Sequence, residues 1–164
     1  MLKKYLAVFL VSMIPLIELR GAIPVAYVFK ANNPEFNLIL AYIVITIGNM
    51  VPVPIIYFFA RKVLEWGKDK PVIGKFFTFC LRKGEKGGQK LQKKAGRGLF
   101  LALALFVGIP LPGTGAWTGT LAASILDMGF KKSVLAVITG VAIASLIIGL
   151  LCTLGLGAWI GITA

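Results

Sequence analysis

The sequence predicts an all-α integral membrane protein built from two inverted repeats, and three observations lead to this fold class. Apolar residues make up 58% of the 164 residues and charged residues only 15%, whereas soluble domains carry about 25% charged residues. Four apolar stretches exceed the roughly 20 residues that a helix needs to cross the hydrocarbon core. They cover residues 5–29, 36–60, 99–126 and 133–164. The third observation is an internal repeat.

The repeat consists of two blocks that interrupt corresponding apolar stretches. Ile14-Pro15-Leu16-Ile17-Glu18-Leu19-Arg20-Gly21 recurs, 95 positions later, as Ile109-Pro110-Leu111-Pro112-Gly113-Thr114-Gly115-Ala116. Leu6, Ala7 and Leu10 match Leu101, Ala102 and Leu105 at the same offset. Broken hydrophobic segments at corresponding places in two halves indicate the binding site of a secondary transporter.

The first broken segment, residues 5–29, contains Pro15, Gly21 and Pro24. A proline inside a helix removes one backbone hydrogen bond and clashes with the preceding turn. In lipid the freed carbonyls need other partners, so such a segment is stable only when it is buried in protein or lines a wet cavity. Two structures fit, a single kinked spanning helix and a re-entrant helical hairpin.

A turn at residues 30–35 leads into a transmembrane helix over residues 36–60, whose second half contains Asn49, Pro52 and Pro54. Asn49 is expected to hydrogen-bond the carbonyls that the prolines free, or alternatively to line the transport pathway.

The connection 61–98 holds twelve of the eighteen basic residues against three acidic ones, a local charge of +9. Such loops stay in the cytoplasm and are attracted to anionic lipids. Within it, residues 71–83 combine an apolar face with basic flanks, which favours an interfacial helix, although a helix packed on the protein's own spans fits equally.

Binding of nucleic acid would need aromatic residues among the lysines. Residues 83–98 contain none, so we expect no nucleic-acid partner.

The second half repeats the order of the first. Residues 99–126 are broken by Pro110, Pro112, Gly113 and Gly115, and after a turn the segment 133–164 provides the last span, with a further break near Gly155 and Gly157. The chain is thus one membrane domain, 1–164. Repeat 1 covers 5–60, the basic connection 61–98, and repeat 2 99–164.

The relative orientation of the halves depends on whether the broken segments cross the bilayer. Re-entrant segments give inverted halves and put Lys131 and Lys132 inside, whereas crossing segments give parallel halves with those lysines outside. Either arrangement leaves one lysine pair on the unfavoured side. We favour the inverted arrangement, because polar residues in both breaks suit a cavity at mid-membrane depth.

Glu18 and Arg20 are the strongly charged residues of the apolar segments. A charge at the centre of a membrane helix costs about 2.5–3.5 kcal/mol on insertion scales. Such residues therefore face a partner, a cavity or the interface. We expect Arg20 to bind an anion and Glu18 to carry a proton or cation. Alternatively, both lie near the headgroups and hold the end of the hairpin.

The second break is the other candidate for substrate binding. Its glycines, Gly113 and Gly115, leave backbone amides uncovered, and a helix that restarts after them directs its positive end to this place. Together with the hydroxyls of Thr114 and Thr118, these amides could bind a phosphate or carboxylate group. Trp117 could form one side of the site. Alternatively, the small residues let helices pack closely.

Other chemistry has little support in the sequence. The chain has no histidine, which removes the commonest metal ligand and general base, and it shows no paired carboxylates or nucleophile–base set. Cys80 and Cys152 lie in different regions and are not expected to pair. We therefore expect no enzyme activity, no cofactor and no metal.

Glu18-Leu19-Arg20-Gly21-Ala22-Ile23-Pro24 and Gly108 to Gly119 resemble the small multidrug export protein family, a distant relative of the DedA superfamily, also called VTT or SNARE-associated membrane proteins. The resemblance covers essentially the whole chain. It implies inverted repeats, each a re-entrant helix followed by a spanning helix, and transport of polyprenyl phosphates or phospholipid headgroups, often coupled to protons. Glu18 and Arg20 would then be the acid and the arginine of the first re-entrant segment. The arginine-rich motif of the DedA second half is missing between Gly113 and Gly119.

The leading functional hypothesis is a proton- or ion-coupled transporter or flippase of the cell membrane for an anionic, lipid-linked or small-molecule substrate. Two alternatives remain. One is an exporter of small hydrophobic cations that uses Glu18, and the other is a non-transporting scaffold that binds anionic lipid through its basic connection. About four membrane segments can hardly enclose a large pathway, which leaves room for a homodimer.

Overall fold

The computed structural model describes residues 1–15, 17–67, 98–111 and 113–155, together with residues 74 and 78. In these residues the regular structure is entirely helical, without strands, which confirms the predicted all-α class. Three predictions lie outside the described residues. They are the interfacial helix at 71–83, the structure of most of the basic connection, and the break at Gly157.

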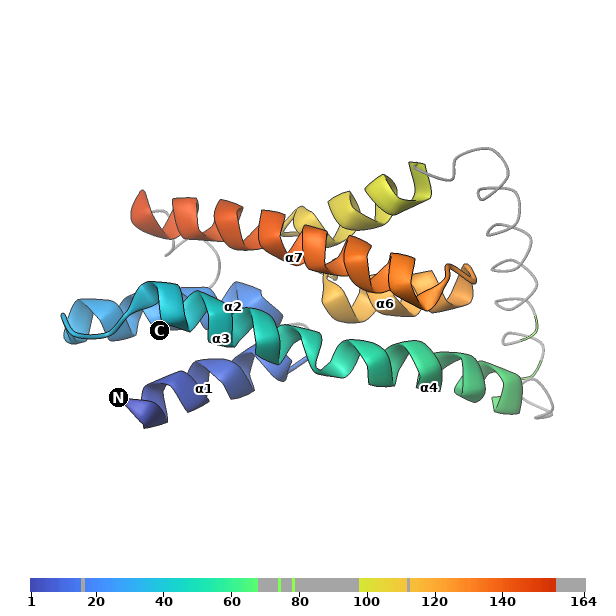
Figure 1. The fold of residues 1–164 in the computed structure, drawn as a ribbon, viewed down its shortest axis with the longest axis horizontal. Coiled ribbons are helices and arrows are strands. Elements are labelled where there is room, and N and C mark those ends of the chain that lie inside the picture. The colour runs from blue at the N-terminus through green and yellow to red at the C-terminus, as the bar shows by residue number, and fades with distance from the viewer. Residues whose placement is uncertain (16, 68–73, 75–77, 79–97, 112, 156–164) are drawn as a thin grey trace.

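The first broken segment forms a helical hairpin. Helix α1 (Leu2–Met13) ends at Ile14, whose backbone is extended (φ −71°, ψ 128°), and α2 (Glu18–Asn32) then runs back beside α1. Figure 1 shows the connection between the two helices near the middle of the molecule, whereas the N-terminus and the end of α2 lie at one end. Pro24 lies inside α2 without ending it.

Helices α3 (Leu38–Met50) and α4 (Pro52–Gly67) follow one another in nearly the same direction (Figure 1). The side-chain oxygen of Asn37 accepts a hydrogen bond from the Leu40 amide at 3.2 Å and caps α3. The residue between the helices, Val51, keeps helical dihedral angles (φ −55°, ψ −45°). Pro52 can start α4 because the first residue of a helix needs no amide donor.

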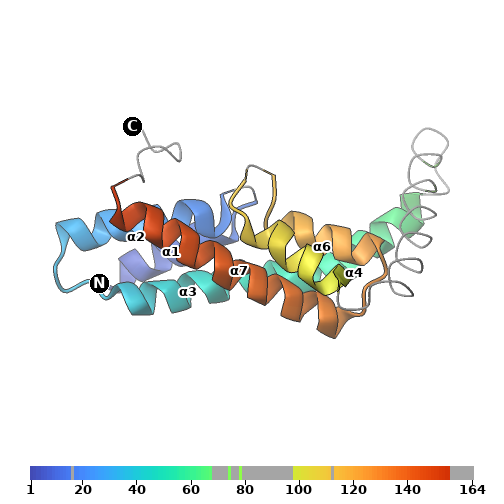
Figure 2. The ribbon, with the colours of Figure 1, turned by 90° about the horizontal axis from the view of Figure 1, so that it is seen from above.

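The second half has the same order of elements. A helix at Gly98–Gly108 is followed by the loop 109–115 near the middle of the molecule. Helix α6 (Ala116–Ile125) then runs back toward the end of the molecule opposite the N-terminus. Helix α7 (Phe130–Thr153) returns along the whole molecule. Figure 2 shows α2 and α3 in one half of the molecule and α4 and α6 in the other, with α7 along both.

Two helices are long and apolar enough to cross a bilayer. The apolar helix Leu38–Phe59 has a mean hydropathy of 2.1, and Phe130–Thr153 has 2.7. Only 33% and 44% of their most apolar windows are buried, whereas the core helix of a soluble protein is mostly buried. Large side chains such as Ile39 and Leu146, each 74% exposed, therefore face outward, as suits a hydrocarbon environment.

Each half is tightly packed at one glycine of its long helix. A Cβ atom on Gly48 of α3 would lie 2.7 Å from the Phe9 carbonyl oxygen of α1. A Cβ atom on Gly140 of α7 would lie 2.6 Å from the Ala104 carbonyl oxygen of the helix Gly98–Gly108. Phe9 and Ala104 are separated by the same 95 positions as the two sequence blocks. Small residues permit this close approach of backbones.

Candidate functional site

The candidate site lies where the connections of the two hairpins meet, in the middle of the molecule. Residues 14–17 form the first tip and residues 109–115 the second. Glu18 and Gly113, which occupy equivalent positions of the two blocks, both have left-handed backbone conformations, with φ of 50° and 81°. For a residue other than glycine this conformation costs about 1–2 kcal/mol, so the contacts of Glu18 must hold it there.

The carboxylate of Glu18 caps helix α6. Its Oε2 atom accepts a hydrogen bond from the Ala116 amide and its Oε1 atom accepts one from the Trp117 amide, each at 3.0 Å. These amides are the first two of α6 and have no partner within the helix. A negative charge there also interacts favourably with the helix dipole. Glu18, only 2% exposed, thus ties the first hairpin to the second.

Gly115 makes this contact possible. A Cβ atom at this position would lie 2.7 Å from the Oε1 and Cδ atoms of Glu18, well inside van der Waals contact. The absence of a side chain at the N-cap of α6 therefore lets the carboxylate reach the amides.

Arg20 binds the second tip as well. One terminal nitrogen, Nη2, donates to the Thr114 hydroxyl at 2.7 Å and to the Ile109 carbonyl at 3.4 Å, and Nη1 donates to the Thr114 carbonyl. The Thr114 hydroxyl in turn donates to the Ile109 carbonyl at 2.8 Å. These acceptors are all neutral. The structure gives Arg20 no ion pair within its described residues, and the buried Nε atom has no hydrogen-bond partner among them.

A cavity of about 590 Å³ opens beside the two tips. Its polar or charged lining residues are Glu18, Arg20, Thr114 and Thr118. The remaining walls are apolar and come from the end of α1, from α4 and from α6: Met13, Pro15, Val51, Pro52, Ile55, Ile56, Phe59, Trp117 and Leu121, with Gly113 beside them. A mostly apolar pocket with a few polar groups at one place is the usual form of a small-molecule site.

The structure brings most of the predicted site residues together. Gly115 contacts Glu18 without lining the cavity, and the Thr118 hydroxyl donates to the Gly115 carbonyl at 3.4 Å. Trp117 lines the cavity, and its buried Nε1 atom has no partner among the described residues. The first two amides of α6 hold Glu18 in this conformation, so a substrate anion would reach them only after the carboxylate leaves.

The other predicted residues lie at the edge of the site or away from it. Asn49 is fully buried, and neither atom of its amide group has a hydrogen-bond partner among the described residues. It is not among the residues that line the cavity. Pro24 is buried within α2, Pro110 belongs to the second tip, and Pro112 lies outside the described residues.

The sequence did not single out the α4 wall of the cavity, which includes Ile55, Ile56 and Phe59. Apolar residues of a membrane helix look the same in a sequence whether they face lipid or a cavity, so no signal distinguishes them. The described residues contain no cluster of three or more histidine, cysteine, aspartate or glutamate side chains that could hold a metal ion.

Comparison with known proteins gave a family match. Neither the curated proteins nor the solved structures gave a match. A profile of the family described as "Putative small multi-drug export protein" matches residues 18–147. This range begins at Glu18 and includes Arg20, the second tip and most of α7. With its two helices of membrane-spanning length, the chain is a membrane protein and belongs to the small multidrug export protein family.

Proposed function

We propose that this protein transports an amphipathic anion across the membrane, and that the anionic group binds Arg20 at the meeting point of two oppositely inserted hairpins. The observation that carries the proposal is the charge balance at the tips. Glu18 is matched by the positive end of α6, whereas Arg20 contacts only neutral oxygen atoms. Glu18 lines the same cavity and its charge acts on Arg20. Because both carboxylate oxygens accept hydrogen bonds from the α6 amides, the charge of Arg20 is only partly balanced within the described residues.

A guanidinium whose hydrogen-bond acceptors are all neutral favours an anionic ligand. Coulomb attraction is several times stronger near a protein interior than in water, because the effective dielectric constant is lower. Arginine also matches the planar geometry of phosphate and carboxylate groups, with two parallel hydrogen bonds. The Nε atom is buried and has no partner among the described residues, so an anion would reach it only after the tips rearrange.

The walls of the cavity suggest the rest of the substrate. Ile55, Phe59 and Leu121 are among its apolar lining residues, and apolar surface gains about 25 cal/mol for each Å² removed from water. A molecule with one charged group and an apolar chain suits this arrangement. Polyprenyl phosphates and phospholipids have this form.

The inverted arrangement of the hairpins is supported by the internal repeat. The hairpins start from opposite ends of the molecule (Figure 1). The equivalent positions Phe9 and Ala104 pack against Gly48 and Gly140 in the same manner, and Glu18 and Gly113 share a left-handed backbone. With the basic connection 61–98 in the cytoplasm, the first hairpin would enter from outside and the second from inside, as in transporters that work by alternating access.

Glu18 would couple transport to protons. Protonation removes the negative charge that interacts with the Ala116 and Trp117 amides, and charge-assisted hydrogen bonds are roughly twice as strong as neutral ones. The tips would then separate, which exposes the amides and Arg20 to the substrate. Deprotonation would close the contact again and release the anion.

The test is transport of a labelled polyprenyl phosphate by purified protein in liposomes with an imposed proton gradient. Wild type should move the label, Arg20→Ala should not, and Arg20→Lys should retain partial activity because lysine keeps the charge but lacks the planar fork. Glu18→Gln should lose the dependence on the gradient. Wild-type rates in Arg20→Ala would refute the proposal.

Export of hydrophobic cations is the second candidate, since the family description names drug export. It needs a free carboxylate at Glu18. Although Glu18 lines the cavity, both of its carboxylate oxygens accept hydrogen bonds from α6 amides and the residue is almost fully buried. Arg20 in the same cavity would also repel a cation. This candidate would be favoured if Glu18→Gln were inactive and Arg20→Ala active. If wild type moved neither an anion nor a cation, a non-transporting scaffold would remain.

A further inference from the structure

We propose that Lys62 and one face of α4 form a second binding site for a phosphate-bearing lipid of the bilayer, placed between the membrane surface and the cavity at the tips. This inference rests on the proposed function and names a station on the substrate's path. Its ligand is a membrane lipid rather than free phosphate, because the site is apolar except for one ammonium group.

The site is a second hollow, of about 320 Å³, along the outer side of α4. Its lining residues are Pro54, Ile55, Phe58, Phe59 and Lys62. Ile55 and Phe59 also line the cavity at the tips. The two hollows are therefore neighbours that share a wall.

The spacing along α4 gives this surface a direction. Ile55, Phe59 and Lys62 follow one another at intervals of four and three residues, which places them on one helix face. From Pro52 at the tip cavity to Lys62, the ten residues of helix rise about 15 Å. That is about half of the roughly 30 Å hydrocarbon core, or the depth of one leaflet. A single acyl or prenyl chain can therefore lie along this face with its head at Lys62.

Lys62 is suited to hold the headgroup. Its side chain is exposed, and the structure gives it no hydrogen bond or ion pair with another described residue. It lies in the last part of α4, where a long basic side chain extends toward the headgroup region. Basic groups at this depth attract anionic lipid. Lys62 and Arg20 thus supply positive charge at the two ends of one apolar path.

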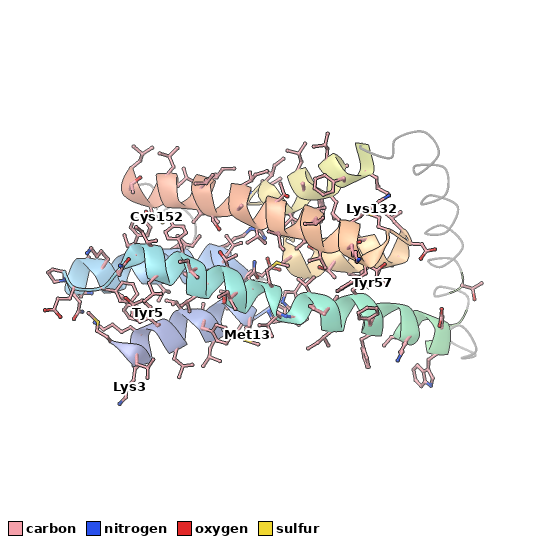
Figure 3. All side chains as sticks on the ribbon, viewed as in Figure 1. Lys3, Tyr5, Met13, Tyr57, Lys132 and Cys152 are labelled. Carbon is pink, nitrogen blue, oxygen red and sulfur yellow. The ribbon has the colours of Figure 1, made fainter. Side chains whose placement is uncertain are left out.

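The test is photo-labelling with phosphatidic acid that carries a diazirine in its acyl chain, in phosphatidylcholine vesicles that contain the purified protein. The label should attach to α4, and Lys62→Gln should lower attachment several-fold while Lys62→Arg retains it. Lys132→Gln is the matched control. Lys132 is also exposed and lies in the first turn of α7, in the half of the molecule that contains α4 (Figure 3), but it lines neither hollow. The Lys132→Gln variant should be labelled to the same extent as wild type.

Three results would overturn the inference. The first is that Lys62→Gln is labelled as strongly as wild type. The second is that Lys132→Gln lowers labelling as much as Lys62→Gln does, which would indicate general attraction to a basic surface. Displacement of the label by millimolar inorganic phosphate would indicate a site for the free ion.

The lipid site at Lys62 and the proposed transport function can be tested independently. Arg20→Ala should abolish transport and leave labelling at α4 intact, because Arg20 does not line this hollow. If wild type labels in a Lys62-dependent manner but transports nothing, the lipid site stands and the transport proposal fails. If wild type transports the anion but labelling does not depend on Lys62, the transport proposal stands and the lipid site at Lys62 fails.

Discussion

The Oε1 atom of Glu18 accepts a hydrogen bond from the Trp117 amide at 3.0 Å, across 99 positions of sequence. Glu18 begins α2 and Trp117 is the second residue of α6. One acidic side chain thus replaces the local cap that α6 lacks and ties the two halves of the molecule together. If this contact couples the hairpins, its loss should change both stability and transport.

The first prediction concerns the charge of Glu18. Glu18→Gln keeps the shape of the side chain but presents an amide NH₂ group to one of the two amide donors. We expect a loss of about 1–3 kcal/mol of stability, the usual cost of an unsatisfied buried polar group. Thermal unfolding in detergent measures the loss, and hydrogen exchange should show faster exchange at the Ala116 and Trp117 amides. Unchanged exchange would mean that the contact does not hold α6.

The second prediction concerns Gly115. Gly115→Ala should push the carboxylate away from α6, since the added Cβ atom would overlap with Glu18, and it should reproduce the exchange pattern of Glu18→Gln. Gly129→Ala is a suitable control, because Gly129 has an ordinary φ of −54° and open space around it. Equal behaviour of the two alanine variants would show that the close approach is not needed.

The third prediction concerns Asn49. Because both polar atoms of its buried amide lack described partners, Asn49→Leu should unfold at a higher temperature than wild type, as expected when an unsatisfied polar group is replaced by an apolar one of similar size. If the variant is instead less stable, the amide has a partner, such as a bound water. A more stable variant that transports poorly would indicate that Asn49 serves the pathway.

The fourth prediction concerns the inverted arrangement. In a Cys80→Ser, Cys152→Ser background, Glu35→Cys and Gly129→Cys should react with an impermeant thiol reagent from opposite sides of the membrane. Both positions are exposed in connections outside the helices. If the broken segments crossed the bilayer completely, both cysteines would react from the same side.

Much of the fold was predictable from local sequence. The density of apolar residues indicates helices in lipid, and Pro15 and Pro110 coincide with the tips of the two hairpins, as expected because proline removes a backbone hydrogen bond inside a helix. Pro24 shows the limit of this rule, since α2 continues through it. Pro52 and Pro54 were expected to disturb the second span, but Val51 stays helical and Pro52 starts a helix. Proline at that position costs little.

The site was only partly predictable. Glu18 and Arg20 could be selected because charge inside an apolar segment is costly. Their partners could not, because the contacts join residues about a hundred positions apart and depend on how the hairpins pack. The sequence favoured a substrate anion on the second tip's amides, where the structure instead has the Glu18 carboxylate.

The most direct test of the central claim, that the cavity selects an anionic group through Arg20, is competition by three detergents of equal chain length. Dodecyl phosphate, dodecanol and dodecyltrimethylammonium would each compete with labelled polyprenyl phosphate for binding to wild type and Arg20→Ala. We predict that dodecyl phosphate competes best with wild type and loses this advantage in Arg20→Ala, by about tenfold if one charged contact is worth about 1.4 kcal/mol. Stronger competition by the ammonium compound, unchanged in Arg20→Ala, would contradict the account and assign the cavity to cations.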